Sequence, residues 1–216
     1  MTIRHRISAV ALSSALAVGG FAVVPALVSP VAAQAPVIRE DLLGVVAAGA
    51  LRDLGVYLDT GSPTAQQSYN SARHEIALVV AERLALDPLQ LESAWTIADA
   101  EHQTALMAAL SQLGVAYRHN TSKPGVGFDC SGLTTFAWGR AGITLDRQSG
   151  SQIRAAASRS AATAEAGDLV YYPGHVMIWL GVGTAIVHAP FTGRTVEVGF
   201  AASGRRHSLR YGDPTA

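Results

Sequence analysis

The sequence of 216 residues contains a single cysteine, Cys130, so no disulfide can form within the chain. It also lacks an excess of charge of either sign, because Lys and Arg number 16 and Asp and Glu also number 16. No basic patch indicates a nucleic-acid partner. After the first 35 residues, no apolar run is long enough to cross a bilayer, so no stable membrane insertion is expected of the remainder.

The first 35 residues have the pattern of a secretory signal. Arg4 and Arg6 precede an apolar run over residues 7–28, and Ala33-Gln34-Ala35 has the small-residue form that signal peptidase accepts. Cleavage there leaves a chain with a net charge near −2, because two basic residues and no acids are lost. An uncleaved membrane anchor is the alternative. We expect a secreted, extracytoplasmic protein.

Residues 36–99 are predicted to be a helical N-terminal region. Apolar residues recur at helical spacing over 38–57, and Ser62 followed by Pro63 marks a helix start that runs to Leu84. Asp87 followed by Pro88 marks a further start, for a helix expected to continue to Gly114. The pattern does not decide whether this region binds a protein partner or only packs.

Residues 100–216 are predicted to be the catalytic domain. A short helix is expected from Cys130 to Ala141, and short apolar stretches separated by Gly or Pro indicate antiparallel strands. These strands are expected at residues 168–172, 175–180, 185–189, 195–198 and 207–211. Helices followed by a run of strands indicate the α+β class.

Cys130 is the candidate nucleophile. It precedes the predicted short helix, and the positive end of a helix or a nearby histidine lowers the pKa of a thiol. A low-pKa, accessible thiol is therefore expected. The alternative is a buried cysteine that packs as a small hydrophobe, but the polar neighbours Asp129 and Ser131 and the export of the chain argue against it.

Two of the seven histidines flank one predicted hairpin. With a turn at Val182-Gly183, the numbers of opposed residues sum to 365, so His188 lies opposite Met177 and diagonal to His175. Diagonal neighbours are close enough for long side chains to meet. One histidine can then accept the thiol proton while the second orients it. The same three side chains could instead hold a metal, but no close-spaced ligand pair is present, so no metal and no cofactor are expected.

The order of five segments resembles the NlpC-type (NlpC/p-sixty) bacterial cell-wall cysteine endopeptidases. The resemblance extends over about residues 103–200 and is carried by Gly127–Leu133, Leu145–Ser149, Ala166–Val170, Gly174–Val176 and Val187–Pro190. It implies a papain-like α+β fold, with N-terminal helices packed on a small antiparallel sheet. It also implies a Cys130-His175-His188 triad that hydrolyses peptide bonds in peptidoglycan stem peptides, commonly the D-γ-glutamyl to diamino acid bond.

The same resemblance implies a set of oxyanion- and substrate-binding residues. Tyr117 is carried over as a donor to the oxyanion or the substrate, and Asp129 and Ser131 as contacts of the amino end of the stem peptide. Arg147 and Ser149 match a groove segment. Each has a simpler reading, because Tyr117 can be a core aromatic and Asp129 a helix cap. Asp168 matches a turn position and is interpreted as structural.

Two positions depart from the family pattern. The family has an aromatic residue and two glycines where this chain has residues 118–121, and a small residue where it has Met177. Strand alternation puts Met177 on the face of the histidines, so we expect it to narrow the groove. A peptidoglycan-binding member without catalytic activity and a related cysteine amidase or acyltransferase are the alternative functions.

Overall fold

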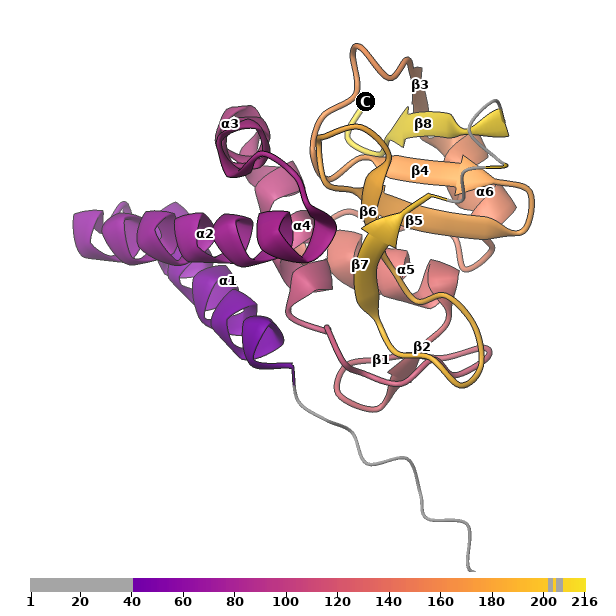
Figure 1. Cartoon of the computed structure of the whole chain (residues 1–216), viewed down its shortest axis with the longest axis horizontal. Helices are drawn as coiled ribbons and strands as arrows, with labels where there is room; N and C mark the ends of the chain where they lie inside the picture. The colour runs from indigo at the N-terminus through magenta and orange to yellow at the C-terminus, as the bar shows by residue number, and fades with distance from the viewer. Residues whose placement is uncertain (1–40, 202–203, 205–207) are drawn as a thin grey trace, which may run out of the picture. The chain divides into compact units, whose positions relative to one another are not determined.

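Helices form the first part of the structure and an antiparallel sheet forms the last part (Figure 1). The computed structural model describes residues 41–201, 204 and 208–216, and the predicted signal segment lies outside them. The helices are α1 (Leu42–Thr60), α2 (Pro63–Leu84), α3 (Pro88–Ile97), α4 (Ala100–Leu110), α5 (Cys130–Arg140) and α6 (Ser149–Ala155). This content confirms the α+β class.

Side-chain caps set the starts of the N-terminal helices. Asp41, Ser62 and Asp87 each accept a hydrogen bond from a backbone N–H in the first turn of α1, α2 and α3. Pro63 and Pro88 occupy the first positions of α2 and α3, where a missing N–H costs nothing. The predicted starts of both helices are therefore confirmed.

The single helix expected from residue 88 to Gly114 is wrong. The backbone leaves the helical conformation at Ala98, and α4 begins two residues later. Asp99 is the cause, because its carboxylate accepts the backbone N–H of His102 at 2.8 Å and so caps a new helix. The apolar spacing continues across the break, which concealed it.

Six strands form one antiparallel sheet in the order β3-β8-β4-β5-β6-β7. They are β3 (Ala157–Arg159), β4 (Leu169–Tyr172), β5 (His175–Trp179), β6 (Ala185–His188), β7 (Glu197–Phe200) and β8 (Arg210–Asp213), and a separate ribbon joins β1 (Ser122–Lys123) to β2 (Gly127–Phe128). In the β5–β6 hairpin, Ile178 lies opposite Val187, which is the predicted register. The stretch expected at 207–211 forms a strand only from Arg210, and His207 lies outside the described residues.

One hydrophobic cluster extends from α1 through α4 and α5 to β5 and β6. Trp95 of α3 is completely buried in it, and its indole N–H donates to the carbonyl oxygen of Leu180 at 2.8 Å. The N-terminal helices are therefore fixed against the end of strand β5. This is the arrangement expected, with helices packed on a small antiparallel sheet, and α5 packs against β5.

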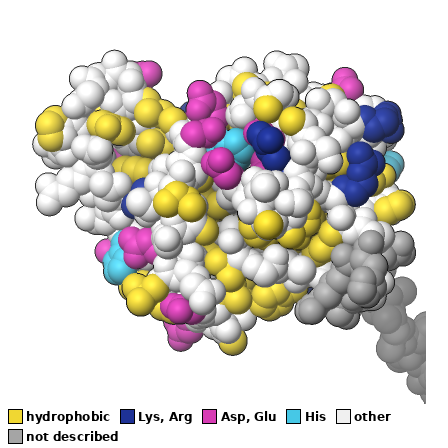
Figure 2. All heavy atoms as spheres, turned by 90° about the horizontal axis from the view of Figure 1, so that it is seen from above, with side chains coloured by type: hydrophobic (Ala, Val, Ile, Leu, Met, Phe, Trp, Pro, Cys, Tyr) yellow, Lys and Arg dark blue, Asp and Glu magenta, His cyan; other side chains and the backbone are white. Residues whose placement is uncertain are grey.

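The surface is mixed in character. On the face drawn in Figure 2, Lys and Arg side chains lie in small separate groups among acidic and hydrophobic ones. Several large hydrophobic side chains of the helices are exposed, among them Leu42, Leu89 and Ile97. Within the described residues, no helix combines the length and the apolar character needed to cross a membrane.

Candidate active site

Cys130 is the first residue of α5, directly after the capping residue Asp129. The Asp129 carboxylate accepts the backbone N–H of Gly132 at 2.7 Å, which fixes the first turn of the helix. The Cys130 sulfur accepts a hydrogen bond from the backbone N–H of Val176 on β5. Because Val176 follows His175, this contact brings the sulfur to the start of the strand that carries the first histidine.

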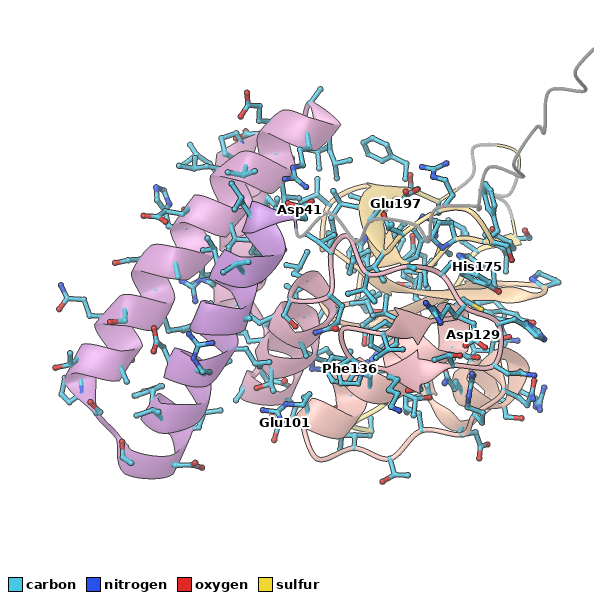
Figure 3. All side chains as sticks on the ribbon, turned by 90° about the horizontal axis from the view of Figure 1, so that it is seen from below. Asp41, Glu101, Asp129, Phe136, His175 and Glu197 are labelled. Atoms are coloured by element: carbon cyan, nitrogen blue, oxygen red, sulfur yellow. The ribbon has the colours of Figure 1, made fainter. Side chains whose placement is uncertain are left out.

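The two histidines are in direct contact, as the predicted hairpin register requires. Nε2 of His175 lies 2.8 Å from Nδ1 of His188, and the two rings meet edge to face with centroids 5.1 Å apart. His175 is 7% exposed. In Figure 3, His175 and Asp129 lie at the end of the sheet region remote from the α1–α2 hairpin.

Glu197 lies behind the histidine pair. It is the cross-strand partner of His188 on β7, and its Oε1 is 3.7 Å from Nε2 of His188. Arg194 donates from Nη2 to both carboxylate oxygens of Glu197, at 2.6 and 2.7 Å. A carboxylate near Nε2 favours the tautomer of His188 that carries its proton there. Nδ1 of His188 then accepts from Nε2 of His175, which leaves Nδ1 of His175 as a free base.

Cys130, His175 and His188 are all uncharged before a substrate binds. Burial lowers the pKa of both histidines to about 4, with the neighbouring His188 adding to the effect at His175 and Arg194 at His188. Burial also raises the pKa of the Cys130 thiol, and this outweighs the stabilising backbone N–H groups of Val176 and α5. The expectation of a low-pKa thiol is therefore wrong for the resting site. The helix start was correctly placed, but the sequence did not reveal the burial.

A polar group lies beside the cysteine. Arg147 donates from Nη1 to the Ser131 hydroxyl at 2.8 Å and from Nη2 to the Asp129 carboxylate at 2.6 Å. Tyr117 is close to them, because its backbone pairs with Phe128, two residues before Cys130. Burial raises the pKa of the Tyr117 hydroxyl. The structure thus brings four of the five expected substrate-binding residues together around Cys130.

Ser149 is the exception among these five. It is the first residue of α6, and no hydrogen bond from its side chain to the other four is present in the described structure. Its neighbour Gln148 occupies the capping position of α6 but makes no side-chain capping hydrogen bond. The groove role expected of Ser149 therefore rests on the sequence resemblance alone.

Met177 does not line a groove, contrary to the expectation. It is 1% exposed and packs in a hydrophobic cluster with Trp179, Ile186 and Tyr211. The register that places it near His188 is correct. The error lay in extending the open site two residues along the strand, since Met177 is packed there among other hydrophobic side chains.

Comparison with known proteins gives a family match over part of the chain. The model of the NlpC/P60 family matches residues 114–206, which include Cys130, both histidines and the polar group beside them. These residues are an NlpC/P60-family domain. The sequence resemblance is thereby confirmed.

Curated relatives of this NlpC/P60 domain are peptidoglycan endopeptidases by name. The chain is 39% identical over 90 residues to the bifunctional muramidase/DL-endopeptidase CwlT of Bacillus subtilis, which is 38% of this chain and 27% of CwlT. It is 36% identical over 105 residues to the peptidoglycan endopeptidase RipA of Mycolicibacterium smegmatis, which is 41% of this chain and 21% of RipA. The chain thus spans about a quarter of the length of these relatives.

Solved structures also show a partial similarity to the chain. A mutated form of the Resuscitation Promoting Factor Interacting protein RipA gives a TM-score of 0.46 at 26% identity, over 52% of this chain and 62% of that one. An NlpC/P60 family protein from Bacillus cereus gives a TM-score of 0.47 at 25% identity, over 52% of this chain and 39% of that one.

His102 of α4 is a buried residue that the sequence pattern did not reveal. Its Nδ1 lies 2.7 Å from Asp99 Oδ1 and its Nε2 lies 3.1 Å from Asp168 Oδ1, while Asp213 is 3.6 Å away. Burial alone would lower the pKa of His102, but the hydrogen bonds and charges of Asp168 and Asp99 outweigh it and raise the pKa to about 9. Asp168 is therefore structural, as interpreted, and joins α4 to the NlpC/P60 domain.

Metal-ligating side chains lie within reach of one another at this histidine rather than at Cys130. In the part of the chain that the structure describes, the two such groups are Asp99-His102-Glu165 and His102-Asp168-Asp213. A protonated His102 donates to the aspartates, and Arg159 donates to Asp213 at 2.5 Å. His102 and Arg159 thus neutralise part of the negative charge of these carboxylates, which fits a structural ion-pair network.

Gln152 of α6 is a second residue that the sequence analysis missed. It is completely buried, and its Nε2 donates to the carbonyl oxygens of Ser131 and Asp146 while its Oε1 accepts from Thr134. It therefore holds the loop before Arg147 against the helix of Cys130. A glutamine three positions after Ser149, in a polar stretch, gave no sign of burial.

Proposed function

We propose that this protein is a secreted cysteine peptidase that hydrolyses peptide bonds in peptidoglycan stem peptides, at the D-γ-glutamyl to diamino acid bond. The observation that carries the proposal is a pair of contacts: the Cys130 sulfur meets the N–H of Val176, the residue after His175, and His175 meets His188. It has the order of nucleophile, base and orienting residue that acyl transfer requires. The names of the curated relatives supply the substrate class.

Because Cys130 and His175 are both uncharged before the reaction, the first step must include transfer of the thiol proton. Nδ1 of His175 accepts the thiol proton as the Cys130 sulfur attacks the scissile carbonyl carbon, and the charge passes to the carbonyl oxygen. The backbone N–H of Cys130, at the start of α5, is positioned as a donor to that oxygen. The imidazolium of His175 then protonates the leaving amine, and water hydrolyses the thioester.

His188 and Glu197 keep the base in the productive tautomer. While Glu197 holds the proton of His188 on Nε2, Nδ1 of His188 accepts from His175. Loss of His188 should therefore slow the reaction without removing the nucleophile or the base.

The polar group is proposed to bind the substrate. We assign Asp129 and Ser131 to the amino end of the stem peptide and Tyr117 to the oxyanion or the substrate, with Arg147 orienting Asp129. Ser149 is assigned to the adjoining groove. The proposal also includes the organisation of the chain: a secretory signal over residues 1–35, a helical region over 36–99 as the candidate site for a protein partner, and a catalytic domain over 100–216. We propose that the secreted enzyme acts at the cell wall.

The test is incubation of the purified protein, without residues 1–35, with muropeptides, followed by mass analysis of the products. Cleavage should release a fragment with a new amino terminus on the diamino acid. Cys130→Ala and His175→Ala should abolish turnover, whereas His188→Ala should leave a fraction of it. His74→Ala is the matched control, because His74 is an exposed histidine of α2.

The products distinguish the alternatives. An amidase would release the whole stem peptide from the sugar, and an acyltransferase would require an added amine acceptor. A protein that binds muropeptides with unchanged affinity in Cys130→Ala and forms no product would be a binding member of the family. Full turnover by Cys130→Ala would show that Cys130 is not the nucleophile.

A further inference from the structure

Arg73, in the middle of α2, is a buried cation without an anionic partner. Arg73 is only 8% exposed, and within the described residues no carboxylate lies within 4 Å of its guanidinium. Buried arginines are normally paired, since transfer of a charge out of water is costly. An unpaired one needs another source of compensation.

The neighbours of Arg73 are neutral. Its Nη1 donates a long hydrogen bond, 3.5 Å, to Gln103 Oε1, and its guanidinium also hydrogen-bonds the neutral Tyr69 hydroxyl, while its Nε is buried with no partner in the described structure. The guanidinium carbon lies 5.4 Å from the centre of the Tyr69 ring. Burial raises the pKa of Tyr69 to about 12, so its hydroxyl stays protonated and supplies no negative charge.

Arg73 faces a polar cavity of about 340 Å³ where α1, α2, α3 and α4 meet. Apart from Arg73, the cavity is lined by the polar side chains Tyr57, Gln66, Tyr69, Asn70, Thr96 and Gln103. The hydroxyls of Tyr69 and Thr96 already donate, to Gln103 Oε1 and to the carbonyl oxygen of Glu92. Gln103 is held in place, because its Nε2 donates to the carbonyl oxygen of Ala98 at 2.6 Å and its Oε1 accepts from Tyr69 at 2.6 Å. The cavity thus offers the hydroxyl of Tyr57 and the side-chain amides of Gln66 and Asn70 as donors beside one positive charge.

We propose that this cavity binds a small carboxylate, such as the carboxyl terminus of a peptide. The planar guanidinium matches a carboxylate with two parallel N–H donors, and amide and hydroxyl groups can satisfy the remaining lone pairs. One cation balances one negative charge, which suits a carboxylate better than a phosphate of nearly twice that charge. The ligand would occupy the helical region and leave the Cys130 site free.

Titration of the protein without residues 1–35 with N-acetylalanine, followed by calorimetry and by nuclear magnetic resonance at low ionic strength, tests the proposal. Binding of the free acid and none of its carboxamide is expected. Inorganic phosphate is the competing probe, and tighter binding of phosphate than of N-acetylalanine would overturn the assignment to a carboxylate. Absence of binding of N-acetylalanine at low ionic strength would overturn the site itself.

Variants locate the binding. Arg73→Met should weaken it at least about tenfold, since a hydrogen bond to a charged group is lost. Thr96→Phe fills the cavity, leaves Arg73 in place and should also abolish binding, which provides a test if Arg73→Met fails to fold. Arg154→Met, at an exposed arginine of α6, is the matched control. Binding that survives Thr96→Phe, or is lost equally in Arg154→Met, would contradict the proposal.

Discussion

The buried ion-pair network at His102 predicts how the stability of the protein depends on pH. His102 is 1% exposed and its pKa is raised from 6.5 to about 9 by Asp168 and Asp99 against the opposing effect of burial. A histidine whose pKa is higher in the folded state than in the unfolded state binds its proton more tightly when folded. Its contribution to the free energy of unfolding is therefore full below about pH 6.5 and is lost as the pH rises through 9.

The size of the effect follows from the two pKa values. A rise from 6.5 to about 9 corresponds to about 3 kcal/mol, at about 1.4 kcal/mol for each pH unit. His102→Gln removes the titrating group and keeps a side chain that can donate one hydrogen bond. The variant should be less stable than the wild type at pH 6, and about 3 kcal/mol of the difference should be absent at pH 10.

Urea denaturation of both proteins at pH 6 and pH 10 measures this difference directly. Groups that titrate in both proteins, such as His175 and His188, cancel in the comparison. By thermal denaturation the gap between the two melting temperatures should narrow by roughly 6–12 °C over the same range. An equal difference in stability between the two proteins at pH 6 and pH 10 would show that His102 is uncharged in the folded protein. The protonation state assigned to His102 would then be wrong.

Three further outcomes follow from the site. The rate of iodoacetamide labelling of Cys130 should keep rising with pH beyond the point at which an ordinary thiol levels off, because burial raises the pKa of its thiol, and a plateau already reached below pH 8 would contradict this. Met177→Ala should lower stability by about 2–5 kcal/mol with no gain in turnover, since Met177 is core, and faster cleavage of muropeptides would refute it. Gln152→Ala should lower the melting temperature and raise KM for muropeptides, because buried carbonyl groups lose their donor and the Arg147 loop is released; unchanged values of both would be incompatible with its position.

Local signals in the sequence predicted most of the fold. Ser62-Pro63 and Asp87-Pro88 gave the starts of α2 and α3, and glycines at the β5–β6 turn gave a register that holds in the structure. The break at Asp99 was missed because the apolar periodicity continues through it. A single aspartate at such a position can be either a solvent-exposed residue within a helix or the cap of a new one, and the sequence does not distinguish the two.

The sequence predicted which residues lie together at the candidate site, but it did not predict their protonation states. The resemblance and the hairpin register brought Cys130, His175 and His188 together, whereas the protonation of each depends on burial. Burial is a property of the packed chain, so the sequence could not distinguish His102, whose acidic neighbours raise its pKa, from His175, whose surroundings lower it. The same limit hid the role of Gln152.

Gly132, in the first turn of α5, also limits how this protein can change in evolution. A Cβ at this position would lie 2.1 Å from the backbone oxygen of Thr121, and the Gly132 carbonyl accepts from the Ser122 hydroxyl at 2.8 Å. The loop after Tyr117 is therefore seated on the backbone of the helix that carries Cys130. The side chain of His119 in this loop is exposed and can diversify, whereas Asn120 has a positive φ of 54° that restricts the residue type. Position 132 has no such freedom, so a library that randomises it should return glycine alone among folded, active clones.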